Sequence, residues 1–313
     1  MDARPVVPHG PADLPLSERV WRLSPGTCLM LAPGTYRGPI ALPHDIELRA
    51  AGGLGSVTVD CHQGGTLSVE GADRVRLVDL VLRGPRHGMG AVLRIYNPAD
   101  VTIEGCLLTG GRGLGQGGGA IDIQQGRLQL DRCRLTQNAA MQGGALRAAG
   151  AVLVTVRNSV FADNVAAGVG GGGVFASVAA EVKLVGCTFV ANTAKLGSAI
   201  LAGGDPLGHG QVEAHNCLFS ASGAELSATA IAPGHLRLTH CVLPALPRDV
   251  HEGVEVGAGV LERRLEVFAA GDAAWTAKFA TLLDGLGDPT LYDEGELDLR
   301  DKARGRIWIG AVG

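Results

Sequence analysis

The chain has 313 residues, of which 48 are glycine, 46% are hydrophobic and only 4% are aromatic. This apolar content excludes a disordered chain, the irregular glycine spacing excludes collagen, and no apolar run reaches the roughly 18 residues of a membrane helix. The formal net charge of −4 gives no basic field, so we expect neither nucleic acid as a partner nor insertion into a membrane.

The N-terminal residues lack the pattern of a secretory signal, which is a basic stretch followed by an apolar one. If Met1 is the natural start, we expect a cytoplasmic protein; if a leader has been removed, we expect a secreted or cell-surface protein. The seven cysteines are an odd number and cannot all pair within one chain. We therefore expect free thiols rather than a disulfide framework.

Residues 1–26 are predicted to be a capping segment at the start of the fold. They precede the first repeat, and the stretch Leu14–Trp21 carries apolar residues that would cover the open end of a stacked sheet. Such an end exposes an unpaired strand edge, which proteins usually cover.

Residues 27–260 contain a repeat of about 27 residues. Each copy alternates apolar and polar residues, as in Val101–Cys106, and this alternation predicts a strand with one buried face. A second strand is predicted after a glycine-rich turn about midway between copies, as at Gly143–Leu146. One repeat is too short to bury its own apolar face, whereas stacked repeats share a core. We therefore predict a parallel β-helix of about eight coils, with a β-sandwich as the structural alternative.

Two columns of like residues are expected to run through the stacked coils. One column holds cysteines that we predict to point inward as small apolar side chains: Cys106, Cys133, Cys187, Cys217 and Cys241, with Leu80 and Ser159 in the same register. The other column has side chains that can hydrogen-bond from rung to rung: Asn138, Asn164 and Asn192. Both columns are interpreted as structural.

Residues 261–313 are predicted to form a C-terminal cap. Within 272–283, Trp275 and Phe279 share one helical face and Asp272 is a suitable N-cap, which predicts a helix. A returning strand is expected over residues 306–310.

The repeats resemble those of right-handed parallel β-helix proteins of the pectin-lyase-like class. Their Gly-Gly-Ala-Ile and Phe-x-x-Asn marks, at Gly118–Ile121 and Phe161–Asn164, are similar to the repeats of polymorphic outer-membrane proteins. Leu31–Tyr36 resembles the opening segment of bacterial members, and Ile307–Ala311 resembles the end of many such chains. The resemblance implies an all-β, single-stranded right-handed parallel β-helix solenoid over residues 27–260. The class includes lyases, hydrolases, epimerases, adhesins and non-catalytic scaffolds, so it does not by itself select a function.

The candidate site is a column of charged residues that should face outward from three consecutive coils. Aligning Leu93–Ile95, Ile121–Ile123 and Leu146–Ala148 places Arg, Asp and Arg in one column, because the flanking apolar residues must face the core. Two Arg forks beside a carboxylate suit an anionic ligand, whereas an exposed charge ladder would contribute under about 1 kcal/mol per pair. The catalytic candidates are Arg94, Asp122 and Arg147. The predicted binding residues are these three together with His87, Tyr96 and Gln124.

No cofactor and no metal are predicted. Two Gly-x-Gly-x-x-Gly matches, Gly113–Gly118 and Gly168–Gly173, lie in predicted coil turns rather than at the start of a helix, so no dinucleotide site is expected. For the lyases of the class, the resemblance implies an Arg base beside Ca²⁺ held by acidic residues. Asp122 stands alone and does not supply such an acidic cluster.

Two functions are left open. The first is a non-catalytic binding or scaffold module that presents a long face to a protein or polymer partner, favoured by short regular coils and the lack of an acid cluster. The second is a lyase or hydrolase that acts on an acidic polysaccharide, favoured by the fold class and the charged column. The low aromatic content argues against the second, because sugar sites usually stack rings on Trp or Tyr. We predict the first, with an unidentified protein or polysaccharide as partner, and allow for oligomers.

Overall fold

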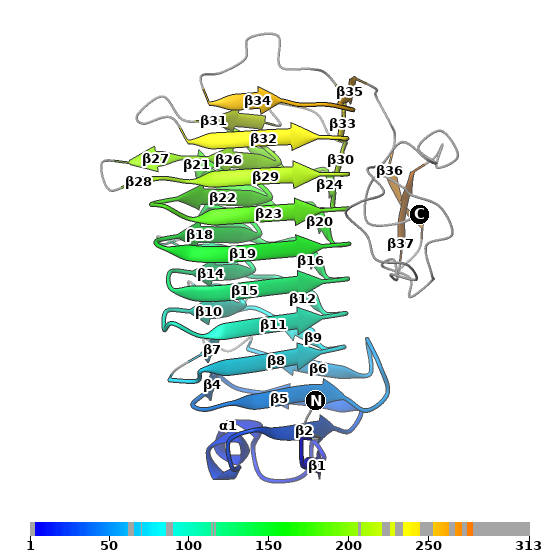
Figure 1. The fold of residues 1–313 in the computed structure, drawn as a ribbon. Helices are drawn as coiled ribbons and strands as arrows, with labels where there is room; N and C mark the ends of the chain where they lie inside the picture. The colour runs from blue at the N-terminus through cyan, green and yellow to red at the C-terminus, as the bar shows by residue number, and fades with distance from the viewer. Residues whose placement is uncertain are drawn as a thin grey trace.

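The chain winds as a tall coil in which each strand lies beside the equivalent strands of the turns before and after it (Figure 1). The computed structural model describes residues 4–61, 66–69, 71–85, 90–113, 115, 117–205, 208–220, 226–228, 234–244, 253–262, 267–270 and 274–277. Neighbouring strands of the coil pair in parallel, as where Leu128 lies opposite Val154. The parallel β-helix predicted from the repeats is therefore confirmed.

The longest sheet, sheet A, contains the strands in which the repeat was recognised. Its alternation buries every second side chain: Val101 and Ile103 are buried in the core, while Thr102 between them lies on the outer side. In spatial order the strands of sheet A are β1 (Val6–His9), β2 (Thr27–Leu31), β5 (Ile46–Ala50), β8 (Arg74–Val78), β11 (Asp100–Glu104), β15 (Gly126–Asp131), β19 (Val152–Arg157), β23 (Glu181–Val185), β29 (Gln211–His215), β32 (His235–Thr239) and β34 (Val254–Val256).

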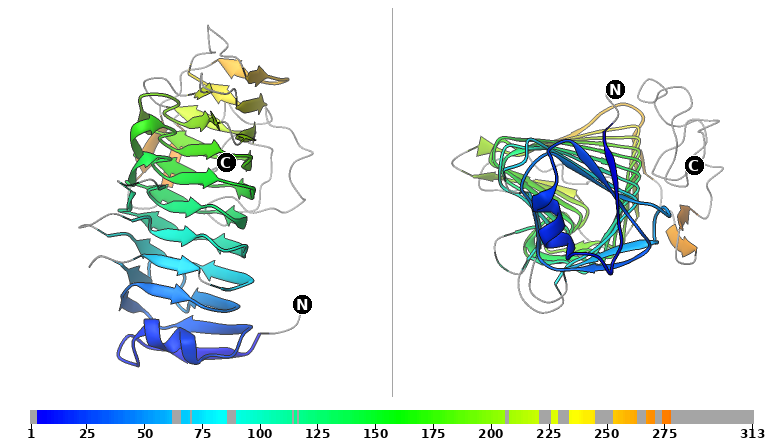
Figure 2. Two further views of the ribbon diagram at one scale, coloured as in Figure 1. Left: turned by 90° about the vertical axis from the view of Figure 1, so that its left-hand side faces the viewer. Right: turned by 90° about the horizontal axis from the view of Figure 1, so that it is seen from below.

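Two more long sheets complete the wall around one apolar core, which Figure 2 shows end-on. Sheet B consists of β3 (Gly34–Arg37), β6 (Val57–Asp60), β9 (Val81–Arg83), β12 (Leu107–Thr109), β16 (Arg134–Thr136), β20 (Val160–Ala162), β24 (Thr188–Val190), β30 (Leu218–Ser220), β33 (Val242–Leu243) and β35 (Leu261–Glu262). Sheet C consists of β4 (Ile40–Leu42), β7 (Leu67–Val69), β10 (Leu93–Ile95), β14 (Ile121–Ile123), β18 (Leu146–Ala149), β22 (Val174–Ser177), β26 (Ile200–Ala202) and β31 (Leu226–Ala228).

A short sheet and two hairpins account for the other described strands. Sheet D lies between sheets B and C along the chain and consists of β13 (Arg112–Gly113), β17 (Ala139–Gln142), β21 (Val165–Gly170) and β25 (Thr193–Ala194). The antiparallel hairpins pair β27 (Gly204–Asp205) with β28 (Gly208–His209), and β36 (Val267–Ala270) with β37 (Ala274–Ala277).

A tight corner joins the strands of sheet A to those of sheet B and explains the cysteine column. Its first residue has a left-handed backbone, with φ of 50° at Arg132 and 49° at His240, which turns the next residue inward. That next residue is a cysteine in five coils, and all five cysteines are completely buried. The predicted inward register is confirmed, and all seven cysteines of the chain are unpaired thiols.

The asparagine column lies at the corner after sheet B and forms a continuous ladder. Nδ2 of Asn138 donates to Oδ1 of Asn164 at 3.0 Å, and Nδ2 of Asn164 donates to Oδ1 of Asn192 at 2.9 Å. Nδ2 of Asn164 also donates to the main-chain carbonyl oxygen of Leu135 at 2.9 Å. The ladder thus provides partners for polar groups that are buried at this corner.

A stack of aromatic rings fills the core next to the asparagine ladder. The ring centroids of Phe161 and Phe189 are 4.7 Å apart, and those of Phe189 and Phe219 are 5.0 Å apart. The Phe-x-x-Asn pattern of the sequence therefore describes two parallel columns, one apolar and one polar, that hold the middle coils together.

The N-terminal segment covers the first coil with one helical turn. α1 (Leu16–Arg19) and the 3-10 turn η1 (Val20–Arg22) lie at the lower end of the coil in Figure 1. Leu16 and Val20 are buried, whereas Trp21 is 59% exposed. The cover is therefore made by two aliphatic side chains and not by the tryptophan.

The described residues beyond the coil form a hairpin where a helix was predicted. Ala269 of β36 lies opposite Trp275 of β37, so the predicted helix over 272–283 is wrong at residues 274–277. Both strands contain β-branched or aromatic residues, which favour strands, and pairing between the strands outweighs the helical spacing of the apolar residues. Residues 278–283 and the predicted strand over 306–310 lie outside the described residues. Within the described part of the chain, no helix has the length and apolarity to cross a bilayer.

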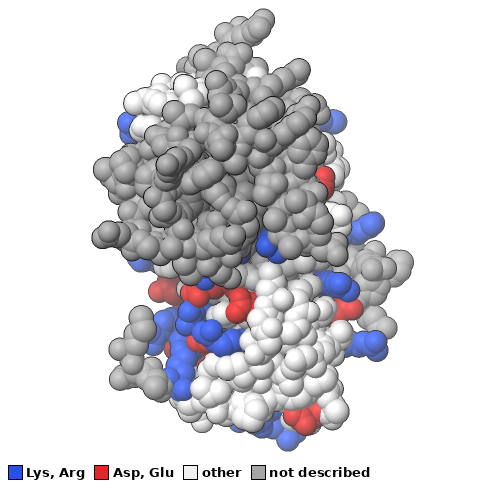
Figure 3. Space-filling model, turned by 90° about the vertical axis from the view of Figure 1, so that its right-hand side faces the viewer, with Lys and Arg blue, Asp and Glu red and all other residues white. Residues whose placement is uncertain are grey.

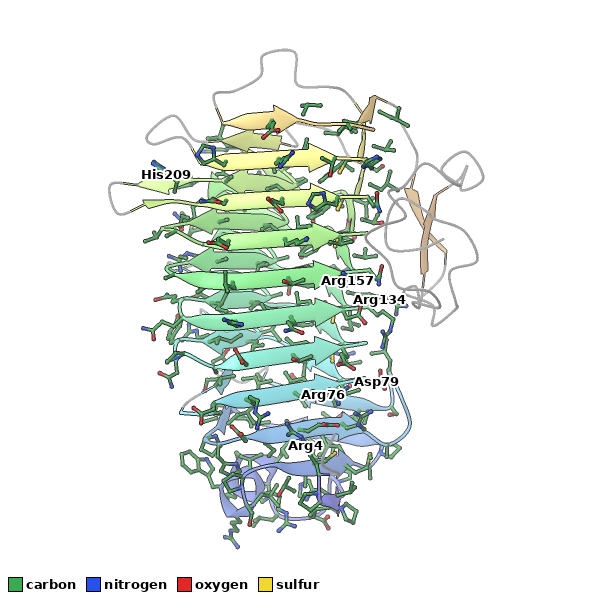
Figure 4. The ribbon with its side chains drawn as sticks, viewed as in Figure 1. Arg4, Arg76, Asp79, Arg134, Arg157 and His209 are labelled. Carbon is green, nitrogen blue, oxygen red and sulfur yellow. The ribbon has the colours of Figure 1, made fainter. Side chains whose placement is uncertain are left out.

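The outer face of sheet A carries a network of paired charges in the first coils, around the Arg76 labelled in Figure 4. Glu47 is almost fully buried, and its carboxylate lies 2.6 Å from Nη2 of Arg49 and 3.4 Å from Nη1 of Arg76. Arg76 also contacts Glu104 at 2.8 Å. Burial alone would raise the pKa of Glu47, but the two arginines hold it below its ordinary value. These charges neutralise one another, and we interpret the network as structural.

The buried cysteines predict slow chemical modification of the folded protein. Burial raises the pKa of the Cys133 thiol to about 12, so at about pH 8 the folded protein has almost no thiolate at this position. We expect thiol labelling, counted by mass spectrometry, to be slow in buffer and fast in denaturant, where the thiol pKa returns to about 8.5. Fast labelling of several cysteines in the native protein would contradict their inward register.

Candidate functional site

Three neighbouring strands of sheet C position the candidate residues. In β10, β14 and β18, Arg94 lies opposite Asp122 and Asp122 lies opposite Arg147, as the alignment of the repeats predicted. The residues on either side of the aspartate, Ile121 and Ile123, are completely buried and hold the strand against the core. The charged side chains therefore leave the coil on its outer side, from rungs that are about 4.8 Å apart.

Asp122 is the centre of the site, and it is only 1% exposed. Nη1 of Arg147 donates to Oδ1 of Asp122 at 2.9 Å, and the phenol of Tyr96 donates to Oδ2 at 2.8 Å. Gly117 lies against the carboxylate so closely that a Cβ there would come within 3.2 Å of Oδ2. The Asp122–Arg147 pair is therefore a buried ion pair, and not the exposed charge ladder considered from the sequence.

Arg147 is held from two sides. Its Nε donates to Oε1 of Gln142 at 3.2 Å while its Nη1 donates to Asp122, and its side chain is only 15% exposed. Gln142 ends β17 and was not among the residues predicted from the sequence. The sequence does contain a signal that could have pointed to it, since Gln-Gly-Gly occurs at residues 116–118 and again at 142–144.

Arg94 and Tyr96 form the accessible part of the site. Tyr96 is 41% exposed, and Cζ of Arg94 lies 6.0 Å from the centre of its ring, a cation–π distance. Although Arg94 is one rung from Asp122, it makes no hydrogen bond or ion pair with another described residue. Burial, together with the hydrogen bond to Asp122, raises the pKa of the Tyr96 phenol, so this group stays protonated at neutral pH. Of the three charged residues in the column, Arg94 is the one that a ligand can engage without displacing a partner.

The other two predicted residues are Gln124 and His87, and the structure describes only the first. Gln124 is half-buried, and its side-chain amide makes no hydrogen bond to a described residue. His87 lies outside the described residues. Across the described ranges, no three His, Cys, Asp or Glu side chains gather as metal ligands would. The site thus combines the ion-paired Asp122 with Arg94, whose guanidinium has no partner among the described residues, and with the exposed ring of Tyr96. The guanidinium can bind an anion, and the ring can stack against a flat ligand.

A match to a known family agrees with the fold. The sequence matches the model of the right-handed β-helix region over residues 66–232, which is more than half of the chain. A comparison with curated proteins found no match.

Three solved structures resemble this chain at low sequence identity and with TM-scores below 0.5. The alginate lyase from Paenibacillus sp. str. FPU-7 is 16% identical with a TM-score of 0.41, and the alignment covers 80% of this chain and 98% of that one. Pectate lyase Pel9A is 14% identical with a TM-score of 0.43, covering 88% of this chain and 82% of that one. The PL6-family alginate lyase AlyGC is 12% identical with a TM-score of 0.30, covering 89% of this chain and 56% of that one. With its parallel coil and its match over residues 66–232, the chain belongs to the right-handed β-helix family.

Proposed function

We propose that this chain is a non-catalytic binding module whose sheet C face holds an acidic polysaccharide, with Arg94 and Tyr96 as the contact residues. The observation that carries the proposal is the state of Asp122. Arg147 and Tyr96 engage both of its carboxylate oxygens, at 2.9 and 2.8 Å, and its side chain is 1% exposed. A general base must come within hydrogen-bond reach of the proton that it removes. Asp122 instead orients the residues around it.

The accessible residues suit an acidic sugar unit. The Arg94 guanidinium has donors for a carboxylate or sulfate group, and the neighbouring Tyr96 offers an exposed ring edge and face to the apolar side of a sugar. Because the strands of sheet C repeat at a constant rise, a polymer that follows the coil meets a regular outer surface. This geometry favours a repeating acidic polymer over a compact protein partner.

The proposal is tested by affinity electrophoresis and calorimetry with polygalacturonate, alginate and neutral dextran. We expect the wild type to bind the acidic polymers and not dextran. Arg94→Ala should weaken binding by about tenfold, since a charge-assisted hydrogen bond is lost. Arg127→Ala is the matched control, because Arg127 is an exposed arginine of sheet A without a partner among the described residues. Equal binding by the two variants would contradict the proposal.

The alternative function is a lyase or hydrolase for the same polymers, and the unpartnered guanidinium of Arg94 is the observation that favours it. Incubation of each polymer with the wild type, followed by measurement of chain length and of new reducing ends, separates the two functions. If the polymer is cleaved, and if this cleavage is lost in Arg94→Ala and retained in Arg127→Ala, the chain is an enzyme and not a binding module.

A further inference from the structure

A hollow on another wall of the coil brings together polar side chains that the sheet C site does not use. It has a volume of about 780 Å³ and is lined by residues on the outer side of sheet B. Figure 3, which views the molecule from the right-hand side of Figure 1, shows that basic and acidic side chains lie near one another on that side. Asp60, Arg83 and Thr109 occupy the same register position on three consecutive strands, β6, β9 and β12. Arg112 from β13 and Gln137 from the turn after β16 complete the polar lining.

The two arginines of this hollow differ from the paired arginines elsewhere in the coil. Arg83 and Arg112 are both exposed, and neither guanidinium has a hydrogen-bond or ion-pair partner within the part of the chain that the structure describes. The side chains of Thr109 and Gln137 likewise have no partner there. By contrast, the guanidinium groups of Arg76 and Arg147 are held by carboxylates. The hollow therefore contains two unused cationic forks and two unused neutral polar groups.

Glycine keeps the hollow open. Gly110 has a φ of 73°, and a Cβ built on it would meet nothing within 4 Å. In the next coils the same turn position is occupied by Gln137, Asp163 and Ala191, with φ of 57°, 54° and 52°. The turn thus accepts a side chain in this conformation, and its absence at Gly110 leaves this part of the lining of the hollow open.

We propose that this hollow binds a hydroxylated small molecule that carries a tetrahedral oxyanion, a phosphate or sulfate ester. The two oxygens of a carboxylate lie in one plane and pair bidentately with one guanidinium fork. The three terminal oxygens of such an ester group point in different directions and can accept from two forks at once. Thr109, Gln137 and the Asp60 carboxylate provide donors and acceptors for hydroxyl groups. The volume lies within the range of small-molecule sites.

The proposal is tested by calorimetry with glucose 6-phosphate, glucose 6-sulfate, glucuronate and glucose. We expect saturable binding of one or both esters, with glucuronate weaker and glucose not bound; the tighter ester identifies the anion. Arg83→Gln and Arg112→Gln should each weaken ester binding about tenfold or more, with Arg127→Gln unchanged. Gly110→Gln keeps both arginines but fills the space, and it should also weaken binding.

Two outcomes would overturn this proposal. One is glucuronate binding as tight as that of both esters, since the site would then not select a tetrahedral group. The other is equal ester binding by Arg83→Gln and Arg127→Gln, which would mean that the anion is attracted by exposed arginines in general. Arg94→Ala, the variant that tests the sheet C site, should leave intact the ester binding that Arg83→Gln and Arg112→Gln weaken, so the failure of one proposal does not decide the other.

Discussion

Replacing Cys133 with aspartate is expected to destabilise the coil by about 3–5 kcal/mol, a large part of the roughly 5–15 kcal/mol that stabilises a typical domain. Cys133 is completely buried, and its Sγ lies 3.3 Å from the carbonyl oxygens of both Ile103 and Asp131. A carboxylate in this position would be buried beside these two carbonyl oxygens and without a cation to pair with among the described core residues. Denaturant unfolding followed by circular dichroism measures the loss.

The matched control is Cys133→Ser, because the same column already contains a serine. Oγ of Ser159 accepts a hydrogen bond from the main-chain N–H of Cys133 at 3.0 Å and donates to the carbonyl oxygen of Arg157 at 2.7 Å. A hydroxyl is therefore compatible with this column, and the serine variant should lose only about 1 kcal/mol. If the aspartate and serine variants unfold at the same denaturant concentration, Cys133 does not point into the core.

Arg147→Ala is expected to cost about 3–5 kcal/mol, because it leaves Asp122 buried without its cation. Of the two groups that engage the carboxylate, only the Tyr96 phenol would remain, at 2.8 Å from Oδ2. The loss is measured as the decrease in the free energy of unfolding. Arg127→Ala, which removes an exposed arginine from sheet A, should change this free energy by less than about 0.5 kcal/mol.

A double-mutant cycle isolates the Asp122–Arg147 interaction. In Asp122→Asn the side chain still accepts from Tyr96 but carries no charge, so the double variant with Arg147→Ala should be more stable than Arg147→Ala alone. If Arg147→Ala and Arg127→Ala lower the free energy of unfolding by the same small amount, the Asp122–Arg147 pair behaves as an exposed charge ladder. The burial of Asp122 would then have no energetic effect.

The coil could be predicted well from the sequence because equivalent positions of successive repeats lie beside one another in neighbouring coils. The cysteine at the end of each repeat follows a corner residue with a left-handed backbone, so equal spacing in sequence becomes a vertical column in space. The same spacing placed Arg94, Asp122 and Arg147 on consecutive rungs. These features depend on a local period alone.

Features that depend on more than the period were missed. The burial of Asp122 requires Tyr96 from one neighbouring coil and the close approach of Gly117, and the contact between Gln142 and Arg147 joins two different sheets. The hollow beside Arg83 depends on side chains from four strands and a turn, which no single repeat reveals. Residues 274–277 form a strand because they pair with β36, although the spacing of their apolar residues is that of a helix.

We expect the asparagine ladder and the phenylalanine stack also to influence the order in which the coils unfold. In a linear array each turn contacts only its two neighbours, so the stability of each region follows from the strength of its own interfaces. Side-chain amide hydrogen bonds join the turns that contain Asn138, Asn164 and Asn192. Ring contacts join the turns that contain Phe161, Phe189 and Phe219, and together these turns form a central block. We therefore expect local unfolding to begin at the two ends of the coil, and the amide protons of this central block to exchange last. Arg147 lies within the block and Arg94 before it, so fraying from the N-terminus separates the ligand-facing arginine from its neighbours while the buried ion pair is still intact.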